Sequence, residues 1–362
     1  MSAILRAAVL AWLLPVAALA DTYVYVAATV GGVIDVFRMN TEGVLSPVST
    51  ARVGAGVGPM AVSPDRAHLY AAVRKPPYHV VTLAIDPLTG TLAQKAVAPT
   101  FENFAYVSLD PAGRTLLGAS YAGGAVVTLP VGQDGLITAG PRQVQPAGRN
   151  AHAIRTDAAG RVAFSTALGT DEVIRFTIDA DSGMLTPLDE AETGAGSGPR
   201  HLVFSPAGDR LYVVTEFSGE VVRFDVTANG LAEMGRVSIL PEGTALQNGL
   251  PPLVKRDGVP RIWAADILIT PDGRFLYVTE RTTSRISLID TGGGMRLIET
   301  FATEKQPRKI GMSPDGRFLA AAGERSDRMT LYAIDPETGH LAQTARVRVG
   351  TGPTWVEFVP VP

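Results

Sequence analysis

The chain has 362 residues, of which 46% are hydrophobic and 19% are charged, and it contains 38 Gly and 26 Pro. This composition suits a β-rich globular protein with many turns and excludes an intrinsically disordered chain. The formal net charge is −3 and no basic clusters occur, which argues against binding to nucleic acid or to a membrane surface. The chain has no Cys, so neither disulfides nor thiolate chemistry is available to it.

The first 20 residues have the pattern of a secretory signal peptide. Arg6 supplies a short basic region, residues 7–14 are apolar, and residues 18–20 (Ala-Leu-Ala) form a small-residue cleavage site. The apolar run is too short to span a bilayer, and no later stretch has about 20 uninterrupted apolar residues. We therefore expect a mature chain that begins at Asp21, is periplasmic or secreted, and has no membrane span. The alternative is an uncleaved N-terminal anchor.

After residue 21 the chain contains a sequence repeat with a nearly constant period. Its clearest copy is residues 198–226, in which three short apolar runs are separated by two turn signals. The turn after the first run, residues 206–209 (Pro-Ala-Gly-Asp), is typical of a tight hairpin. The same turn recurs from Pro64 in steps of 47, 47, 48, 65 and 43 residues. A Gly followed closely by a Leu, which opens a fourth strand, recurs seven times and places one insertion in the same interval.

The two ends of the chain complete each other. Residues 22–27 and 33–39 match the second and third strands of the repeat but have no first strand. Residues 352–358 (GPTWVEF) match the first strand in residues 198–204 (GPRHLVF), so the last strand is expected to pair with the first segment. Seven four-stranded units closed in this way form an all-β, seven-bladed β-propeller. We interpret residues 21–362 as a single domain, because no linker interrupts the repeats.

This architecture predicts where a site lies. In each blade the beginning of the first strand and the end of the second open on the same face of the central channel. The polar residues at these positions are His152, Arg200, His201, Glu216, Asp266, Arg281 and Arg308. The insertion, roughly residues 236–262, joins a fourth strand to the next first strand and is a candidate lid over that face.

The remaining histidines and the carboxylates point to no other site. His68, His79 and His340 each lie near a turn signal, and we expect surface or turn roles for them. Histidines and carboxylates do not occur in close pairs with metal-ligand spacing, so we expect no metal site. Residues 292–294 (Gly-Gly-Gly) are expected to form a turn and not a phosphate-binding loop, since no helix follows them.

Three phrases resemble the seven-bladed lactonase family, which includes the propeller type of 6-phosphogluconolactonase and the fungal carboxy-muconate lactonising enzymes. They are GPRHLVFSPAGDRLYVVTEFSGEV (198–221), WAADILITPDGRFLYVTERTTS (263–284) and QPRKIGMSPDGRFLAAAGERSDRMTLYAID (306–335). The resemblance covers essentially the whole mature chain. It implies that the family's active-site His, Arg, Glu and second Arg correspond to His152, Arg200, Glu216 and Arg281, the last across the insertion.

These residue types suit the opening of a lactone. The reaction needs a base to activate water, stabilisation of an oxyanion and a proton for the leaving ring oxygen. His152 and Glu216 are the candidates for acid–base catalysis, and Arg200 and Arg281 are the candidates for holding the oxyanion or an anionic substituent. The candidate substrate-binding residues are His201, Asp266 and Arg308. The chain has no G-x-S-x-G elbow, so we expect direct attack by water.

The predicted function is therefore hydrolysis of a sugar lactone, similar to that of a 6-phosphogluconolactonase, by a monomer that needs no cofactor. Because the chain carries an export signal, either the substrate is an unphosphorylated sugar lactone or the scaffold serves another purpose. One alternative is a lactonising or lactone-opening enzyme for a carboxylated diene. Another is a non-catalytic propeller that binds a protein or a glycan, since the fold alone permits this. In that case the Arg–Glu pairs are solvated ion pairs.

Overall fold

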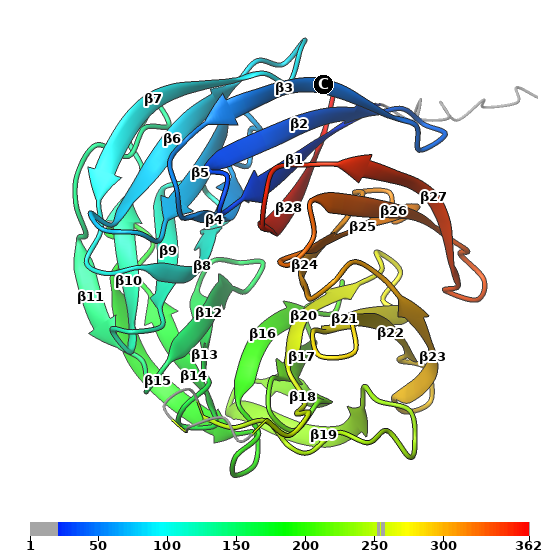
Figure 1. Ribbon diagram of the computed structural model, residues 1–362. Coiled ribbons are helices and arrows are strands. Elements are labelled where there is room, and N and C mark those ends of the chain that lie inside the picture. The colour runs from blue at the N-terminus through cyan, green and yellow to red at the C-terminus, as the bar shows by residue number, and fades with distance from the viewer. Residues whose placement is uncertain (1–20, 252–253, 255–257, 362) are drawn as a thin grey trace, which may run out of the picture.

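The computed structural model describes residues 21–251, 254 and 258–361, which form a ring of seven antiparallel sheets around a central channel (Figure 1). Each sheet has four strands, so the predicted seven-bladed propeller is confirmed. The predicted signal peptide, residues 1–20, lies outside the described residues. None of the described residues belongs to a helix that could cross a membrane.

The blades are numbered in chain order, and their strands are given from the channel outward. Blade 1 is β28 (Pro353–Pro360), β1 (Thr22–Ala28), β2 (Val33–Met39) and β3 (Leu45–Arg52). Blade 2 is β4 (Val57–Val62), β5 (His68–Val73), β6 (His79–Ile85) and β7 (Leu92–Pro99). Blade 3 is β8 (Phe104–Leu109), β9 (Thr115–Ser120), β10 (Ala125–Pro130) and β11 (Gln143–Pro146). Blade 4 is β12 (Ala151–Thr156), β13 (Val162–Ala167), β14 (Glu172–Ile178) and β15 (Leu185–Glu192).

The last three blades follow the same order. Blade 5 is β16 (Pro199–Phe204), β17 (Arg210–Thr215), β18 (Glu220–Thr227) and β19 (Gly230–Ser238). Blade 6 is β20 (Ala264–Ile269), β21 (Phe275–Glu280), β22 (Arg285–Asp290) and β23 (Arg296–Ala302). Blade 7 is β24 (Pro307–Met312), β25 (Phe318–Gly323), β26 (Arg328–Ile334) and β27 (Leu341–Arg348).

The ring closes through blade 1, in which the C-terminal strand β28 pairs with β1, as the sequence predicts. The antiparallel register runs from Thr22 opposite Pro360 to Ala27 opposite Trp355. Figure 1 shows the two ends of the chain, β1 and β28, side by side in this blade. Closure removes the free edge that an inner strand would otherwise expose to other chains.

The second strand of each blade is almost entirely buried, because neighbouring blades pack on both of its faces. All the residues of β1, β9, β21 and β25 are buried, whereas the outermost strand β19 is mostly exposed or half-buried. Tyrosines in these second strands also link neighbouring blades by hydrogen bonds. Tyr70 Oη donates to Gly135 O at 2.8 Å, and Tyr277 Oη donates to Gly339 O at 2.7 Å.

The same blade contacts explain the recurring Gly before the fourth strand. Gly90 has a φ of +71°, and a Cβ placed on it would lie 2.4 Å from the ring of Tyr23 in blade 1. A side chain at this position is therefore excluded twice, by the backbone conformation and by the neighbouring aromatic ring. Close contacts with the preceding blade occur at five of the seven landmark positions, Gly43, Gly90, Gly135, Gly183 and Gly339, whereas Gly294 has no neighbouring atom within 4 Å.

The insertion begins slightly later than the sequence indicates. β19 continues to Ser238, because Val237 still pairs with Val221 and Ser238 with Glu220 in the ladder with β18. The insertion therefore occupies residues 239–263, between β19 and β20. The insertion lies on the same face of the ring as the beginning of β20, the first strand of blade 6.

Candidate active site

Beta-bulges at the beginning of the first strands direct polar side chains into one end of the channel. The ladder between the first and second strands skips His152 in blade 4, Arg200 in blade 5 and Arg308 in blade 7. In blade 6 it skips both Ala265 and Asp266. A bulge leaves the extra residue unpaired, bends the strand and re-aims its side chain. Alternation along a regular strand would not bring adjacent residues to the same site, whereas these bulges do.

The second strands supply a further ring of residues at the same end. The residue that directly follows the second strand is, from blade 1 to blade 7, Thr29, Arg74, Tyr121, Leu168, Glu216, Arg281 and Glu324. Arg281 therefore occupies in blade 6 the position that Glu216 occupies in blade 5, which settles its register across the insertion. Reading the sequence at this one repeat position would also have found Arg74, Tyr121 and Glu324.

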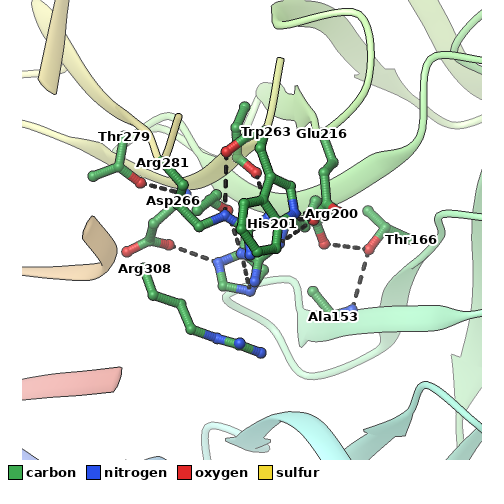
Figure 2. A network of polar contacts seen from close by, with 12 residues as sticks. Ala153, Thr166, Arg200, His201, Glu216, Trp263, Asp266, Thr279, Arg281 and Arg308 are labelled. Carbon is green, nitrogen blue, oxygen red and sulfur yellow. Dashed lines mark hydrogen bonds and ion pairs between the residues drawn. The ribbon is translucent and has the colours of Figure 1, made fainter. Parts of the chain in front are cut away.

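Glu216 joins the two arginines of the predicted site in one buried network (Figure 2). Its Oε2 accepts hydrogen bonds from Arg200 Nε at 2.8 Å and from Arg281 Nη2 at 2.7 Å. Arg200 and Arg281 are only 1% and 2% exposed. Arg281 also donates from Nη2 to the carbonyl of Ala264 at 3.0 Å, and Arg200 Nη1 donates to the carbonyl of Ala265. The guanidinium planes are therefore fixed by carboxylate and backbone acceptors together.

Trp263, the last residue of the insertion, completes this network, and no site role was predicted for it. Its indole Nε1 donates to Glu216 Oε1 at 3.0 Å. The Arg281 guanidinium carbon lies 3.8 Å from the centroid of the indole ring, in cation–π contact. The backbone NH of Trp263 donates to Glu280 Oε1 at 2.9 Å. The insertion is thus anchored directly to the charged centre.

A second layer lies deeper in the channel, below the arginines. His201 Nδ1 lies 2.7 Å from Asp266 Oδ1, and Asp266 Oδ2 lies 3.1 Å from Lys309 Nζ. Asp266 Oδ2 also accepts the backbone NH of Ile310 at 2.9 Å. Arg200 Nη1 lies 3.2 Å from His201 Nε2, and because a guanidinium is only a donor, this nitrogen accepts. The proton of His201 is therefore assigned to Nδ1, which donates to Asp266.

His152 differs from His201 in the hydrogen bonding of its ring. It is 4% exposed, and its Nδ1 is buried with no hydrogen-bond partner among the described residues. Its ring makes edge-to-face contacts with His201 at 5.2 Å and with Tyr121 at 5.6 Å between centroids. Burial, reinforced by the Arg200 guanidinium, holds the pKa of His152 well below its usual value. The imidazole is therefore neutral at neutral pH.

The charges of the other groups follow from their surroundings. Burial opposes ionisation of Glu216, but the guanidinium groups of Arg281 and Arg200 outweigh it and lower the pKa of this carboxyl. Burial lowers the pKa of Arg200 to about 9, so this side chain stays protonated at neutral pH. Burial, followed by the Arg200 charge, lowers the pKa of His201 to about 3. The site therefore combines a neutral imidazole pair with fixed cations and a fixed carboxylate.

A cavity of about 510 Å³ opens beside this network. It is lined by Tyr121, Glu216, Phe217, Thr282, Gln306 and residues 249–251, 254 and 258–263 of the insertion. The predicted position of the insertion over the channel face agrees with this lining. The volume falls within the usual range for sites that bind small molecules.

All seven predicted site residues lie at this end of the channel, but in different settings. His152, Arg200, Glu216 and Arg281 form the upper layer, and His201 and Asp266 lie in the lower layer. Arg308 stands apart: Figure 2 shows no contact between it and the network, and its Nη1 lies 3.3 Å from Glu324 Oε1. Among the described residues, no three His, Asp or Glu side chains form a group that could hold a metal ion.

Comparison with known proteins agrees with the fold. The family model described as "Lactonase, 7-bladed beta-propeller" matches residues 22–358. A 6-phosphogluconolactonase of Sodalis glossinidius is 35% identical over 343 residues, covering 93% of this chain and 98% of that protein. A 6-phosphogluconolactonase of Serratia proteamaculans is 34% identical over 342 residues, with the same coverage of each chain.

Solved structures show the same architecture. A putative 6-phosphogluconolactonase of Bacteroides uniformis superposes with a TM-score of 0.83 at 26% identity, covering 94% of this chain and 99% of that one. A periplasmic gluconolactonase of Pseudomonas aeruginosa also superposes with a TM-score of 0.83 at 26% identity, covering 94% of this chain and 100% of that one. The likeness thus extends over the whole ring, including the blades that carry the charged network.

Proposed function

Because the chain belongs to the seven-bladed β-propeller lactonase family, we propose that it hydrolyses a sugar lactone to the open-chain acid, in the manner of a 6-phosphogluconolactonase. The relatives that carry this name align over nearly their full length. The observation that carries the proposal is that one end of the channel holds two buried guanidinium groups, those of Arg200 and Arg281, and a neutral His152 whose buried Nδ1 has no hydrogen-bond partner among the described residues.

This arrangement suits attack by water on a lactone carbonyl. The water oxygen forms a bond to the carbonyl carbon while His152 takes a proton from the water molecule. Arg200 and Arg281 stabilise the negative charge that develops on the carbonyl oxygen, and because they are already fixed they need no rearrangement. The bond between the carbonyl carbon and the ring oxygen then breaks, and the His152 imidazolium returns its proton to the leaving oxygen. Water and lactone give the hydroxy acid.

We assign Glu216 a different part from the acid–base role predicted for it. A carboxyl whose pKa is lowered by two guanidinium groups is ionised at neutral pH, so it is a poor proton donor. Its oxygens already accept bonds from Arg200, Arg281 and Trp263. In this proposal Glu216 is a positioning residue that holds the two arginines in place.

His201 and Asp266 are also proposed as positioning residues, although substrate contact was predicted for both. Among the described residues, His201 contacts Arg200 and Asp266, and Asp266 contacts His201 and Lys309, so both are linked to the proposed oxyanion site through Arg200. Asp266 fixes the tautomer of His201, and His201 in turn accepts from Arg200. This chain of contacts orients the Arg200 guanidinium from below, as supporting hydrogen bonds do in other sites.

Export to the periplasm or the medium, after cleavage before Asp21, remains part of the proposal. Asp21 Oδ2 accepts from Arg38 Nε at 2.7 Å and would remain in place. The periplasmic gluconolactonase with the same fold supports this location. The expected monomeric state also remains a prediction.

The proposal is tested by titrating the acid released from lactones by the purified protein at constant pH. The substrates are glucono-δ-lactone, its 6-phosphate and a carboxylated muconolactone, with spontaneous hydrolysis subtracted. We expect catalysed opening of a sugar lactone. Opening of the muconolactone alone would favour the diene alternative, and opening of none, with retained binding of a glycan or protein, would replace the enzyme by a binding propeller. His340→Ala, a change at an exposed histidine, serves as the control.

A further inference from the structure

Tyr121 lies at the channel mouth, the end of the channel that carries the site, but the mechanism above gives it no part. It directly follows β9 in blade 3, at the repeat position that Glu216 occupies in blade 5. Its half-buried side chain lines the cavity of about 510 Å³ together with Glu216 and Trp263. Tyr121 therefore borders the space in which the lactone is proposed to react.

The hydroxyl of Tyr121 takes no part in the packing of the blades. Other tyrosines spend this group on a backbone carbonyl of a neighbouring blade, as Tyr70 Oη does on Gly135 O at 2.8 Å and Tyr25 Oη on Gly90 O at 3.0 Å. Among the described residues, no group accepts a hydrogen bond from Tyr121 Oη. Since a phenolic hydroxyl both donates and accepts, this one is available to a molecule in the cavity.

Tyr121 is held beside His152. Its ring lies 5.6 Å from the His152 imidazole between centroids, with the two planes at 87°. Asn150 Nδ2 donates to the backbone carbonyl of Tyr121 at 3.3 Å. Asn150 has a φ of +59° and directly precedes β12, whose ladder skips His152. The turn after β9 and the bulge that aims His152 are thus tied together, so the two rings keep a fixed relation.

The surroundings of Tyr121 keep its hydroxyl protonated. Burial, followed by the Glu216 carboxylate, raises the pKa of Tyr121 to about 12, against the opposing charges of Arg200 and Arg281. The groups that act on this hydroxyl are those of the charged network, so the phenol belongs to the same end of the channel. A phenol that is neutral at neutral pH is a proton donor and not a base.

The reaction leaves one task for such a donor. Arg200 and Arg281 act on the carbonyl oxygen, and His152 acts on the attacking water. The ring oxygen leaves as an alkoxide, which is more basic than a phenolate and so takes a proton readily from a phenol. The His152 imidazolium is in turn a strong enough acid to restore the phenol, because the pKa of His152 is held well below its usual value.

We propose that Tyr121 is a further catalytic residue, whose hydroxyl donates a proton to the leaving ring oxygen of the lactone. This inference rests on the proposed lactonase function and adds a residue to it. When the bond between the carbonyl carbon and the ring oxygen breaks, its electron pair stays on the ring oxygen, which takes the Tyr121 proton. The His152 imidazolium then reprotonates the phenolate. Water and lactone still give the hydroxy acid, and both side chains return to their starting states.

The first test is the steady-state hydrolysis of glucono-δ-lactone by Tyr121→Phe, which keeps the ring and loses only the hydroxyl. We expect kcat to fall by about 10²-fold, while KM changes by less than about threefold and the urea unfolding curve stays unchanged. Tyr70→Phe is the matched control, because it removes a hydroxyl that bonds Gly135 O in a contact between blades, and it should keep the wild-type kcat. A wild-type kcat in Tyr121→Phe would overturn the assignment.

A second test separates proton donation from a role in binding or positioning. Dihydrocoumarin is a lactone whose leaving group is a phenol, and with a pKa of about 10 this group departs with little need of a proton. The loss of kcat in Tyr121→Phe should therefore shrink to less than about threefold with this lactone. Equal losses with dihydrocoumarin and with glucono-δ-lactone would contradict proton donation by Tyr121.

The same assays separate this inference from the proposed function. Turnover of glucono-δ-lactone by the wild type and by Tyr121→Phe at the same rate would overturn the role of Tyr121 and leave the lactonase function standing. A wild type that opens no lactone would overturn both.

Discussion

Replacing Glu216 by Gln removes the single negative charge between two buried arginines. The carboxylate accepts from Arg200 Nε at 2.8 Å, from Arg281 Nη2 at 2.7 Å and from Trp263 Nε1 at 3.0 Å. The amide of Gln has nearly the same shape, but only one of its two terminal atoms accepts hydrogen bonds. At least one donor therefore loses its acceptor, and both guanidinium groups lose their counter-ion.

The cost to stability follows from this geometry. Breaking a buried ion pair by removing one partner costs about 3–5 kcal/mol, because an uncompensated charge stays buried. The Glu216 side chain is 11% exposed, while those of Arg200 and Arg281 are 1% and 3% exposed. This slight solvent access places the expected loss at the lower end, about 3 kcal/mol in the free energy of unfolding.

The effect should depend on pH with a definite sign. The folded-state pKa of Glu216 is lowered from its usual value near 4.5, so its charge stabilises the fold above that pH. This contribution is lost as the pH falls through the lowered folded-state pKa. The difference in stability between wild type and Glu216→Gln should thus be largest at neutral pH and shrink in acid below about pH 4.5.

The measurement is urea unfolding of both proteins at several pH values, with Glu233→Gln as the matched control. Glu233 pairs with Arg236 at 2.8 Å on the outer strand β19, where both side chains are 35% exposed. Such an exposed pair contributes at most about 1 kcal/mol. A loss for Glu216→Gln no larger than that for Glu233→Gln, or one that grows as the pH falls, would refute the counter-ion role of Glu216.

Three further results are expected. Trp263→Phe keeps an aromatic face for Arg281 but removes the hydrogen-bond donor to Glu216. The free energy of unfolding should therefore fall by about 1–2 kcal/mol, and kcat should fall as well. An unchanged kcat in a steady-state assay would contradict the anchoring role of the insertion. Deleting residues 353–362 removes the inner strand of blade 1, and size-exclusion chromatography should show aggregates in place of a soluble monomer. Intact-mass analysis of protein exported by a Gram-negative host should give a chain that begins at Asp21, whereas full-length cytoplasmic protein would contradict export.

The propeller could be predicted because each repeat has similar turn residues and similar short apolar strands. Hairpin turns such as residues 206–209 and the Gly before each fourth strand are local signals. In most blades this Gly is also required by contact with the neighbouring blade, as Gly90 with Tyr23 shows. Closure could be predicted because residues 352–358 match a strand that the N-terminal segment lacks. Only the boundary of the insertion shifted, since an irregular loop and the end of an outer strand have similar sequences.

The site was less predictable, because its layers depend on bulges and on contacts between blades. Repeat position placed His152, Arg200 and Arg308 at the mouth, but the sequence does not show where a ladder skips a residue. The depth difference between Arg200 and His201, which are adjacent in the chain, follows from such a bulge. Partners far apart in sequence, such as Trp263 and Glu216, could be found only from the folded chain.

The central claim, that a neutral His152 activates water at the channel mouth, is tested most directly by the pH dependence of kcat/KM for sugar lactone hydrolysis. Burial and the Arg200 charge hold the pKa of His152 well below its usual value of about 6.5. The kcat/KM of the wild type should therefore stay constant as the pH falls through 6.5 and should decrease only in stronger acid. His152→Ala should lower kcat by about 10²- to 10⁴-fold while the fold stays intact. An acidic limb centred near pH 6.5, or a His152→Ala variant with wild-type turnover, would contradict the account.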